Sequence, residues 1–376
     1  MAARALTLML KLPGEACNID CHYCYEKRKP SGRDGAVEAE QVAALLRAAD
    51  GRPLAVNLHG GEPLIVGKRR MREIFAELRA YPGQLTLNMQ TNGTLLDEEW
   101  LDLIQEEWPT LNLGVSLDGD HLANAFRVDY SGRPTSGRVE ACLDRLGQRG
   151  LRVGIIAVIN SRSSRRPRAA VEYFLRYPAV KVVKFTAAFD HGVDGDPVSV
   201  RERRLALRLA AERSGLSSWG LTPQQYTTFL CETLDAWRDL EAYEHFVLEP
   251  HASIFRALSG RDDASYTCYS SAKCERFLTL NPNGKVHGCD RLPAHEAVGD
   301  VSTVADLGGL AERQAASAIG LRLLALQDKC AGCAYAATCR GGCTTARLAF
   351  QGTPLDDEYC RHRMAVIDYF RAAQRG

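Results

Sequence analysis

The sequence contains no apolar run approaching the roughly 20 residues that a membrane-spanning helix requires, so it does not describe an integral membrane protein. Its amino terminus lacks a small-residue cleavage site behind a long apolar core and does not read as a secretory signal peptide. The net charge of +1 gives no overall attraction to nucleic acid or to an anionic membrane. Internal repeats and low-complexity tracts are also missing. We therefore expect a cytoplasmic globular protein with no nucleic-acid or membrane partner.

What the chain does contain is enough material for two to three domains, since 376 residues exceed the roughly 150 of an average domain. The segment from residue 5 to about 190 alternates short apolar runs with longer stretches whose apolar residues recur at helical spacing. Strict alternation of this kind predicts parallel strands joined by right-handed helical crossovers, in a doubly wound sheet or an incomplete barrel. The strands are expected at residues 5–12, 54–60, 84–91, 111–119, 152–160 and 181–189.

The chain changes character near residue 250. A helical linking region is expected over 191–250, with its clearest helix in TPQQYTTFLCETLDAWRDLEAY. Beyond it come short strands, a turn at NPNGK (281–285) and closely spaced cysteines. We therefore predict three parts: an α/β core over 1–190, the linking region, and a cysteine-rich domain over 251–376.

Thirteen cysteines are many for a chain without an export signal, and in a reducing compartment they are expected to be metal ligands or catalytic groups. Three lie between 17 and 24, and eight fall between 268 and 360. Cys142 and Cys231 stand alone on helix-like segments and are expected to be core thiols. Core packing does not produce such clustering.

Cys17, Cys21 and Cys24 form the pattern C-x3-C-x2-C directly after the first expected strand. All-thiolate sites usually take four cysteines, so three on a cubane cluster leave one iron open for a small molecule. This motif, with the aromatic Tyr23 before its last cysteine, resembles the radical S-adenosylmethionine (SAM) superfamily. Other interpretations are a zinc knuckle completed by His22, or three unrelated loop thiols.

The resemblance implies a partial (β/α)6 TIM-like barrel whose three cysteines hold a SAM-binding [4Fe-4S] cluster. In this family, cleavage of SAM gives a 5′-deoxyadenosyl radical that removes a substrate hydrogen atom. The resemblance also implies SAM contacts after the second, third and fourth strands, with Arg127 either reaching the SAM carboxylate or remaining a surface cation. The other implied contact residues are Gly60, Gly61, Glu62 and Pro63 in HGGEP, Asn92 in QTNGT, and Ser116 in SLDG.

The cysteine pattern of the second half, C-x9-G-x4-C followed by C-x2-C-x5-C-x3-C and a last cysteine, resembles the SPASM extension behind some radical SAM domains. The resemblance implies two auxiliary [4Fe-4S] clusters, making three in all. Two structural zinc sites are the alternative. The implied ligands are Cys268, Cys274, Cys289 and Cys343 for the first cluster, and Cys330, Cys333, Cys339 and Cys360 for the second.

Asp290 directly follows the ligand candidate Cys289. A substrate radical that is oxidised further loses an electron and usually a proton, which calls for a general base within reach. In anaerobic sulfatase-maturating enzymes, which this sequence resembles, an aspartate in the corresponding place is the base. The alternative for Asp290 is a carboxylate that orients the cluster loop.

Two substrate readings compete within this class, and both involve a peptide or protein together with an electron donor such as flavodoxin or ferredoxin. We favour a maturase that forms a carbon–carbon (cyclophane-like), thioether or ether crosslink in a ribosomally made peptide. The alternative is a sulfatase-maturating enzyme that oxidises Cys or Ser to formylglycine. No separate leader-binding domain is expected before the first strand, so the basic stretches at 161–168 and 201–208 are candidates for holding an acidic leader, or else solvated helix faces.

A reading of a different class is a non-catalytic iron–sulfur electron-transfer protein. It leaves the three-cysteine gap and the HGGEP motif without a use.

Overall fold

The computed structural model describes residues 5–26, 35–189, 218–261, 276–292, 297–353 and 355–375. The contacts divide the chain into two compact units. The first unit comprises residues 1–20, 25–115 and 274–322. The second comprises residues 21–24, 116–273 and 323–376. The division predicted from the sequence, into a core, a linking region and a cysteine-rich domain, stays a prediction.

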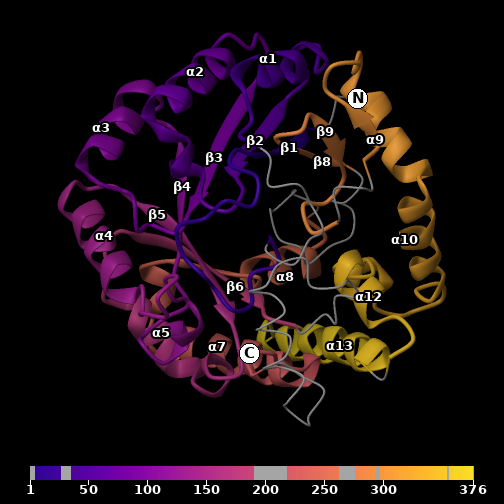
Figure 1. Cartoon of the computed structure of the whole chain (residues 1–376). Helices are drawn as coiled ribbons and strands as arrows, with labels where there is room; N and C mark the ends of the chain where they lie inside the picture. Colours follow the sequence, from indigo (N-terminus) through magenta and orange to yellow (C-terminus); the bar gives the residue numbers. More distant parts are fainter. Residues whose placement is uncertain are drawn as a thin grey trace. The chain divides into compact units, whose positions relative to one another are not determined.

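The first unit is a sheet covered by helices. Its strands are β1 (Leu6–Lys11), β2 (Leu54–His59), β3 (Leu85–Thr91), β4 (Asn112–Ser116), β8 (Phe277–Leu280), β9 (Lys285–His287) and β10 (Gly299–Asp300). Its helices are α1 (Ala39–Arg47), the short η2 (Pro63–Val66), α2 (Gly67–Arg79), α3 (Glu98–Glu107) and α9 (Leu307–Ala316), while α10 (Ala318–Asp328) runs across the point where the two units meet in sequence. Helices α1, α2 and α3 lie along one face of β1 to β4 (Figure 1).

Strands β1 to β4 pair in parallel and in sequence order, as the alternating pattern predicts. The core of the unit is apolar, because strand residues such as Leu8, Val56 and Leu87 pack against the inner helix faces, where Phe75 is fully buried. On its other edge β1 pairs in parallel with β8, which forms an antiparallel hairpin with β9. The cysteine-rich segment therefore contributes strands to the first sheet, a pairing that the sequence did not predict.

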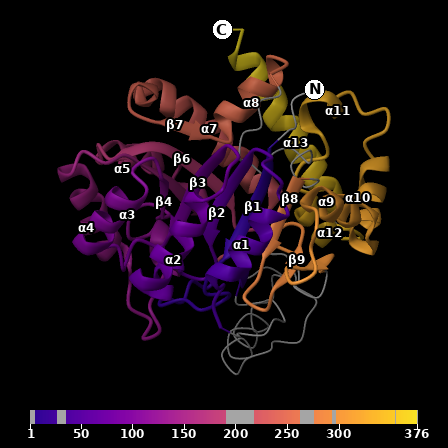
Figure 2. The same ribbon diagram turned by 90° about the horizontal axis from the view of Figure 1, so that it is seen from above.

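In the described part of the second unit, parallel strands are formed by β5 (Val153–Ile159), β6 (Val180–Ala187) and β7 (Val247–Glu249). Helices α5 (Pro167–Leu175) and α7 (Pro223–Asp239) pack together, and α13 (Leu355–Ala373) packs on α7 and on α8 (His251–Leu258) (Figure 2). The His251 and Phe255 rings of α8 contact Phe370 of α13. The helices of this unit are η3 (Ala123–Phe126), α4 (Ser136–Gln148), η4 (Ser163–Arg165), α5 (Pro167–Leu175), α7 (Pro223–Asp239), η5 (Ala242–Glu244), α8 (His251–Leu258), α11 (Ala336–Cys339), α12 (Thr344–Phe350) and α13 (Leu355–Ala373).

All six strands expected between residues 5 and 190 are present, and their ends differ from the predicted ones by no more than a few residues. The helix expected in TPQQYTTFLCETLDAWRDLEAY is confirmed as α7, which Thr222 caps through a capping box, with Pro223 in its first turn. The predicted turn at 281–285 joins β8 to β9, with Gly284 at φ 78°. Among the described residues, no helix is long and apolar enough to cross a membrane.

Candidate active site

The HGGEP segment at the end of β2 supports the loop that begins the cysteine motif. The Gly61 N–H donates to the Gly14 carbonyl, and the Glu62 N–H donates to the Ala16 carbonyl. A Cβ on Gly61 would lie 2.1 Å from the Ala16 oxygen, and Gly60 has a φ of 123°. Glycine is therefore required at both positions for the close approach of two backbone segments. The loop that they support leads directly into Cys17.

Glu62 is a fully buried carboxylate that connects β2 with the loop after β3. It accepts hydrogen bonds from the Thr91 hydroxyl (2.7 Å), the Asn92 N–H (2.7 Å) and the Leu64 N–H (3.1 Å). The Leu64 bond caps η2, in which Pro63 is buried as the first residue. A buried carboxylate with several N–H and O–H donors is well compensated. Glu62 therefore positions backbone at two of the expected SAM-contact segments.

Asn92 lies beside the first cysteine of the motif. Its Nδ2 is 3.8 Å from the Cys17 Sγ and donates to the Asn18 Oδ1 at 2.8 Å. The Asn92 Oδ1 accepts from the Thr94 hydroxyl at 2.6 Å. The amide is thus oriented so that one of its N–H groups faces the Cys17 sulfur.

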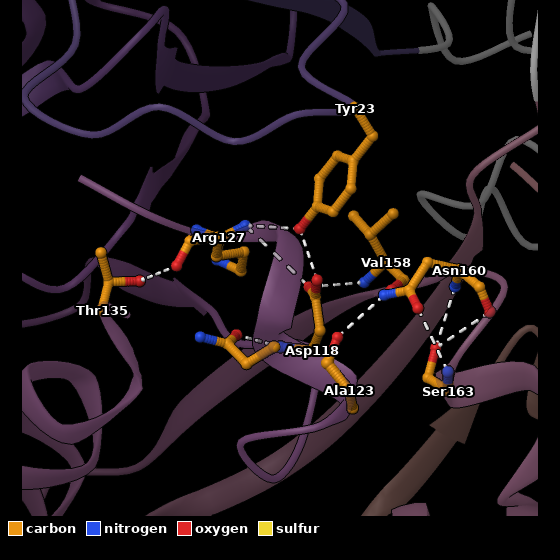
Figure 3. A network of polar contacts seen from close by, with 9 residues as sticks. Tyr23, Asp118, Ala123, Arg127, Thr135, Val158, Asn160 and Ser163 are labelled. Atoms are coloured by element: carbon orange, nitrogen blue, oxygen red, sulfur yellow. Dashed lines mark hydrogen bonds and ion pairs between the residues drawn. The ribbon is translucent and has the colours of Figure 1, made fainter. Parts of the chain in front are cut away.

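The second unit holds a buried network around Tyr23, Asp118 and Arg127 (Figure 3). The Tyr23 hydroxyl donates to Asp118 Oδ2 at 2.5 Å and accepts from Arg127 Nη1 at 3.1 Å. Asp118 also accepts from the Val158 N–H at 3.0 Å. The Arg127 backbone carbonyl accepts from the Thr135 hydroxyl at 2.9 Å. The reading of Arg127 as a surface cation is wrong, because the residue is only 5% exposed.

Electrostatics in this network follow from burial. Burial opposes the Arg127 charge, but Cys21, Tyr23 and Asp118 outweigh that effect and raise the pKa of Arg127 well above its ordinary value. Burial raises the pKa of Asp118 to about 6, against the lowering effects of Arg127 and the Tyr23 and Val158 hydrogen bonds. Burial likewise raises the pKa of Tyr23, so the phenol stays protonated and donates a hydrogen bond to Asp118. Ser116, at the end of β4, is half-buried.

In the first unit, Asp290 belongs to a cluster of charged and phenolic groups. Its Oδ2 accepts from the Tyr25 hydroxyl and lies 3.4 Å from Lys11 Nζ, and its Oδ1 lies 3.6 Å from the Cys289 Sγ. Lys11 also forms a buried ion pair with Glu26. Burial lowers the pKa of Lys11, but Glu26 and Asp290 outweigh this effect and raise it. Lys11 is therefore a cation, 1% exposed, held between two carboxylates.

Four of the predicted ligands line one cavity of about 50 Å³ in the second unit. A single water needs a cavity of roughly 10–15 Å³, so this cavity has room for more than one water or one bare ion. Among the described residues, no group of three His, Cys, Asp or Glu side chains is placed to hold a single metal ion. The volume of the cavity exceeds what one ion requires. The four residues are Cys330, Cys333, Cys339 and Cys360.

Two buried arginines face these sulfurs. Arg347 Nη1 lies 3.5 Å from the Cys330 Sγ, and Arg363 Nε lies 3.4 Å from the Cys339 Sγ. Their exposed fractions are 1% and 2%. Buried cations require negative partners, and an anionic thiolate cluster supplies them. The donor set therefore fits a [4Fe-4S] group bound by four thiolates.

The remaining predicted site residues are placed as follows. Cys268 and Cys274 lie outside the described residues. Cys289 follows the β8–β9 hairpin in the first unit, and Cys343 precedes α12 in the second, where its N–H donates to the Tyr359 hydroxyl at 2.9 Å. Cys142 is buried in α4, as expected for a core thiol, whereas Cys231 is only half-buried on α7.

Sequence reasoning did not find several functional candidates that the structure brings to these sites. Lys11 is the single charged residue of β1, and Tyr25 and Glu26 follow the last motif cysteine directly. Their positions in the sequence could have indicated that these residues belong to the site. The arginines on α12 and α13 carry no such signal, because charged residues on helices usually face solvent.

Residues 12–174 match the Radical SAM superfamily, and this range contains the three-cysteine motif, the HGGEP segment and Arg127. The chain therefore carries a radical SAM domain and is a radical SAM enzyme.

Relatives of known type match nearly the whole chain. The cysteine-type anaerobic sulfatase-maturating enzyme of Clostridium perfringens (strain 13 / Type A) is 25% identical over 384 residues, covering 97% of this chain and 96% of that protein. The serine-type anaerobic sulfatase-maturating enzyme of Klebsiella aerogenes is 25% identical over 388 residues, covering 98% and 87%. A solved structure described as native anSMEcpe with bound AdoMet and Cp18Cys peptide has a TM-score of 0.77 at 21% identity and covers 98% of both chains. The last likeness shows that the α/β radical SAM fold extends over the chain.

Proposed function

We propose that this chain is a radical SAM maturase of the anaerobic sulfatase-maturating type, which oxidises a Cys or Ser of a peptide or protein to formylglycine. The observation that carries the proposal is the alignment along 97% of the chain with a cysteine-type enzyme of this activity. The comparisons therefore favour the alternative of the sequence analysis over the crosslinking reaction that we preferred there.

For the cofactors, the sequence motifs assign Cys17, Cys21 and Cys24 to the SAM-binding cluster, and the interleaved cysteines of the second half to two auxiliary clusters. When bound, SAM and these clusters supply the radical that removes a substrate hydrogen atom and accept the electron that leaves the substrate. From the motifs that carry them, we assign to the SAM site Tyr23, Gly60, Gly61, Glu62, Pro63, Asn92, Ser116 and Arg127.

The step that the side chains of this protein must carry out is the removal of a proton from the substrate. After a hydrogen atom is removed from the Cβ of a substrate Cys, loss of one electron and the thiol proton gives a thioaldehyde, and water then gives formylglycine and hydrogen sulfide. With Ser, loss of one electron and the hydroxyl proton gives the aldehyde directly. We assign Asp290 as the base that accepts this proton. Tyr25 and Lys11 orient its carboxylate.

The test is an anaerobic assay of the reconstituted chain with dithionite, SAM and two peptides spanning the active-site Cys or Ser of a sulfatase. Formylglycine is expected in at least one peptide, detected by mass spectrometry and by reaction with a hydrazide probe. A crosslink also removes two hydrogens but leaves no aldehyde, so a peptide that loses two hydrogens without hydrazide reactivity would overturn the proposal. Production of 5′-deoxyadenosine separates either enzyme from a non-catalytic electron-transfer protein.

A further inference from the structure

The cavity lined by Cys330, Cys333, Cys339 and Cys360 is flanked by cations of two kinds. Lys329 at its rim is exposed and pairs with Asp357 at 2.7 Å and Asp356 at 3.3 Å, so carboxylates offset its charge. Arg347 and Arg363 are buried instead, on α12 and α13. Among the described residues, these two arginines place N–H groups within 3.5 Å of sulfurs that line the cavity.

Arg347 has no carboxylate partner among the described residues. Its Nη1 faces the Cys330 sulfur, its Nη2 donates to the Leu326 carbonyl, and its Nε is a buried donor without an acceptor in the described part of the chain. A buried guanidinium in this state is costly unless an anion lies beside it. The thiolates of the cavity are the anions in reach.

Arg363 approaches the same cavity from another helix. Its Nε lies 3.4 Å from the Cys339 sulfur, and its Nη2 donates to the Cys339 carbonyl at 3.0 Å. The backbone bond fixes the guanidinium plane, so the N–H stays on the sulfur. The two arginines thus contact two different ligands of one set.

Hydrogen bonds to ligand sulfurs and nearby charge are among the factors that set iron–sulfur reduction potentials. Reduction adds one negative charge to a cluster in a poorly screened interior, where buried cations stabilise it more than they would in water. We propose that Arg347 and Arg363 raise the reduction potential of the cluster bound by these four cysteines, so that an electron leaving the substrate comes to rest there. This inference rests on the proposed function for the origin of the electron.

The experiment is a potentiometric titration followed by electron paramagnetic resonance, on the full-length chain with Cys17, Cys21 and Cys24 changed to Ala. This background removes the SAM-binding cluster and leaves the auxiliary signals. The signal of interest is the one lost in Cys333→Ala with Cys339→Ala. Arg347→Gln and Arg363→Gln are compared with Arg361→Gln, which removes the same charge from an exposed position on the same helix as Arg363.

We expect iron content to stay unchanged and the equilibrium constant for reduction of that cluster to fall at least about tenfold in each buried-arginine variant, which is about 59 mV for one electron. Arg361→Gln should leave the potential unchanged, and Arg363→Lys should restore most of the Arg363→Gln loss. An unchanged potential with full iron loading overturns the inference, as does retention of both auxiliary signals in the Cys333/Cys339 variant.

If Arg363→Gln loses iron, Arg363→Lys decides. Full loading and a potential near that of the parent support an electrostatic role, whereas loss of iron in both variants overturns it. The titration contains no peptide substrate, so its result is independent of whether formylglycine forms. A chain that shows the potential shift but makes no formylglycine would contradict the proposed function alone.

Discussion

At the residue scale, the site depends on charged side chains that are removed from water and paired with one another. Asp118 in the second unit and Lys11 in the first are each 1% exposed or less. Each has its own compensation, Asp118 through Tyr23, Arg127 and the Val158 N–H, and Lys11 through two carboxylates. Groups of this kind shift their titration and therefore link stability to pH.

Asp118 gives a pH prediction. Its pKa of about 6 in the folded chain exceeds the ordinary 3.8, so between these values the folded state binds a proton that the unfolded state lacks. The free energy of unfolding should therefore fall by about 3 kcal/mol as the pH rises from about 4 to about 6, and then stay level. Denaturant titrations across this range should show the decline in the parent chain and its loss in Asp118→Asn. The same decline in Asp118→Asn would contradict the assignment, and the exposed Asp239→Asn is the control.

Asp290→Asn tests the base. The variant keeps the size of the side chain but cannot take the substrate proton, so formylglycine formation should slow by roughly 10²- to 10⁴-fold. Iron content and SAM cleavage should remain at parent levels, because Asp290 is neither a predicted cluster ligand nor a predicted SAM contact. Asp300→Asn on β10, a carboxylate of the same unit, should have the parent rate. Full turnover by Asp290→Asn would remove this residue from the mechanism.

At the element scale, the end of β2 determines where the cysteine loop can lie. The two glycines of HGGEP allow the loop before Cys17 to pack directly on backbone, and Glu62 ties the same segment to the loop after β3. The resemblance implies that these glycines contact SAM. The structure shows in addition that they leave room for the backbone of the loop before Cys17.

Gly61→Ala tests this packing. Its added methyl group would overlap the Ala16 carbonyl, which is backbone and cannot swing away, so the loop must shift. We expect loss of roughly a third of the bound iron, that of the SAM-binding cluster, and loss of SAM cleavage. Gly147→Ala on α4 meets open space and should leave both unchanged while stabilising the helix by about 0.5–1 kcal/mol. Parent iron content in Gly61→Ala would contradict the prediction.

The sequence predicted the strands and helices of residues 5–190 because their apolar spacing is local. It did not predict the pairing of β8 with β1, since β8 has four residues and its partner lies far away along the chain. The resemblance of the second-half cysteines to the SPASM extension predicted Cys330, Cys333, Cys339 and Cys360 as one ligand set, and these four residues line one cavity. The arginines beside them could not be predicted, because only tertiary packing buries Arg347 and Arg363.

At the scale of the whole molecule, separate cluster sites predict separable functions. Cys333→Ala with Cys339→Ala should lower bound iron by roughly a third and abolish formylglycine formation, while SAM cleavage continues at a measurable rate, because the three-cysteine motif is intact. The measurements are iron per chain and the ratio of 5′-deoxyadenosine to product. Cys231→Ala on α7 is the control: burial raises the pKa of this thiol to about 12, and it should keep parent iron. Undiminished iron in the double variant would refute the ligand assignment.

The pairing of β1 with β8 has a consequence for biosynthesis. While the ribosome is still adding the middle of the chain, one edge of the first strand has no neighbour from residues 277–280, and open strand edges recruit foreign strands. Closing that edge requires contact between segments more than 260 positions apart, and such distant pairings form slowly. The supply of chaperones during expression should therefore have a strong influence on the yield of intact protein.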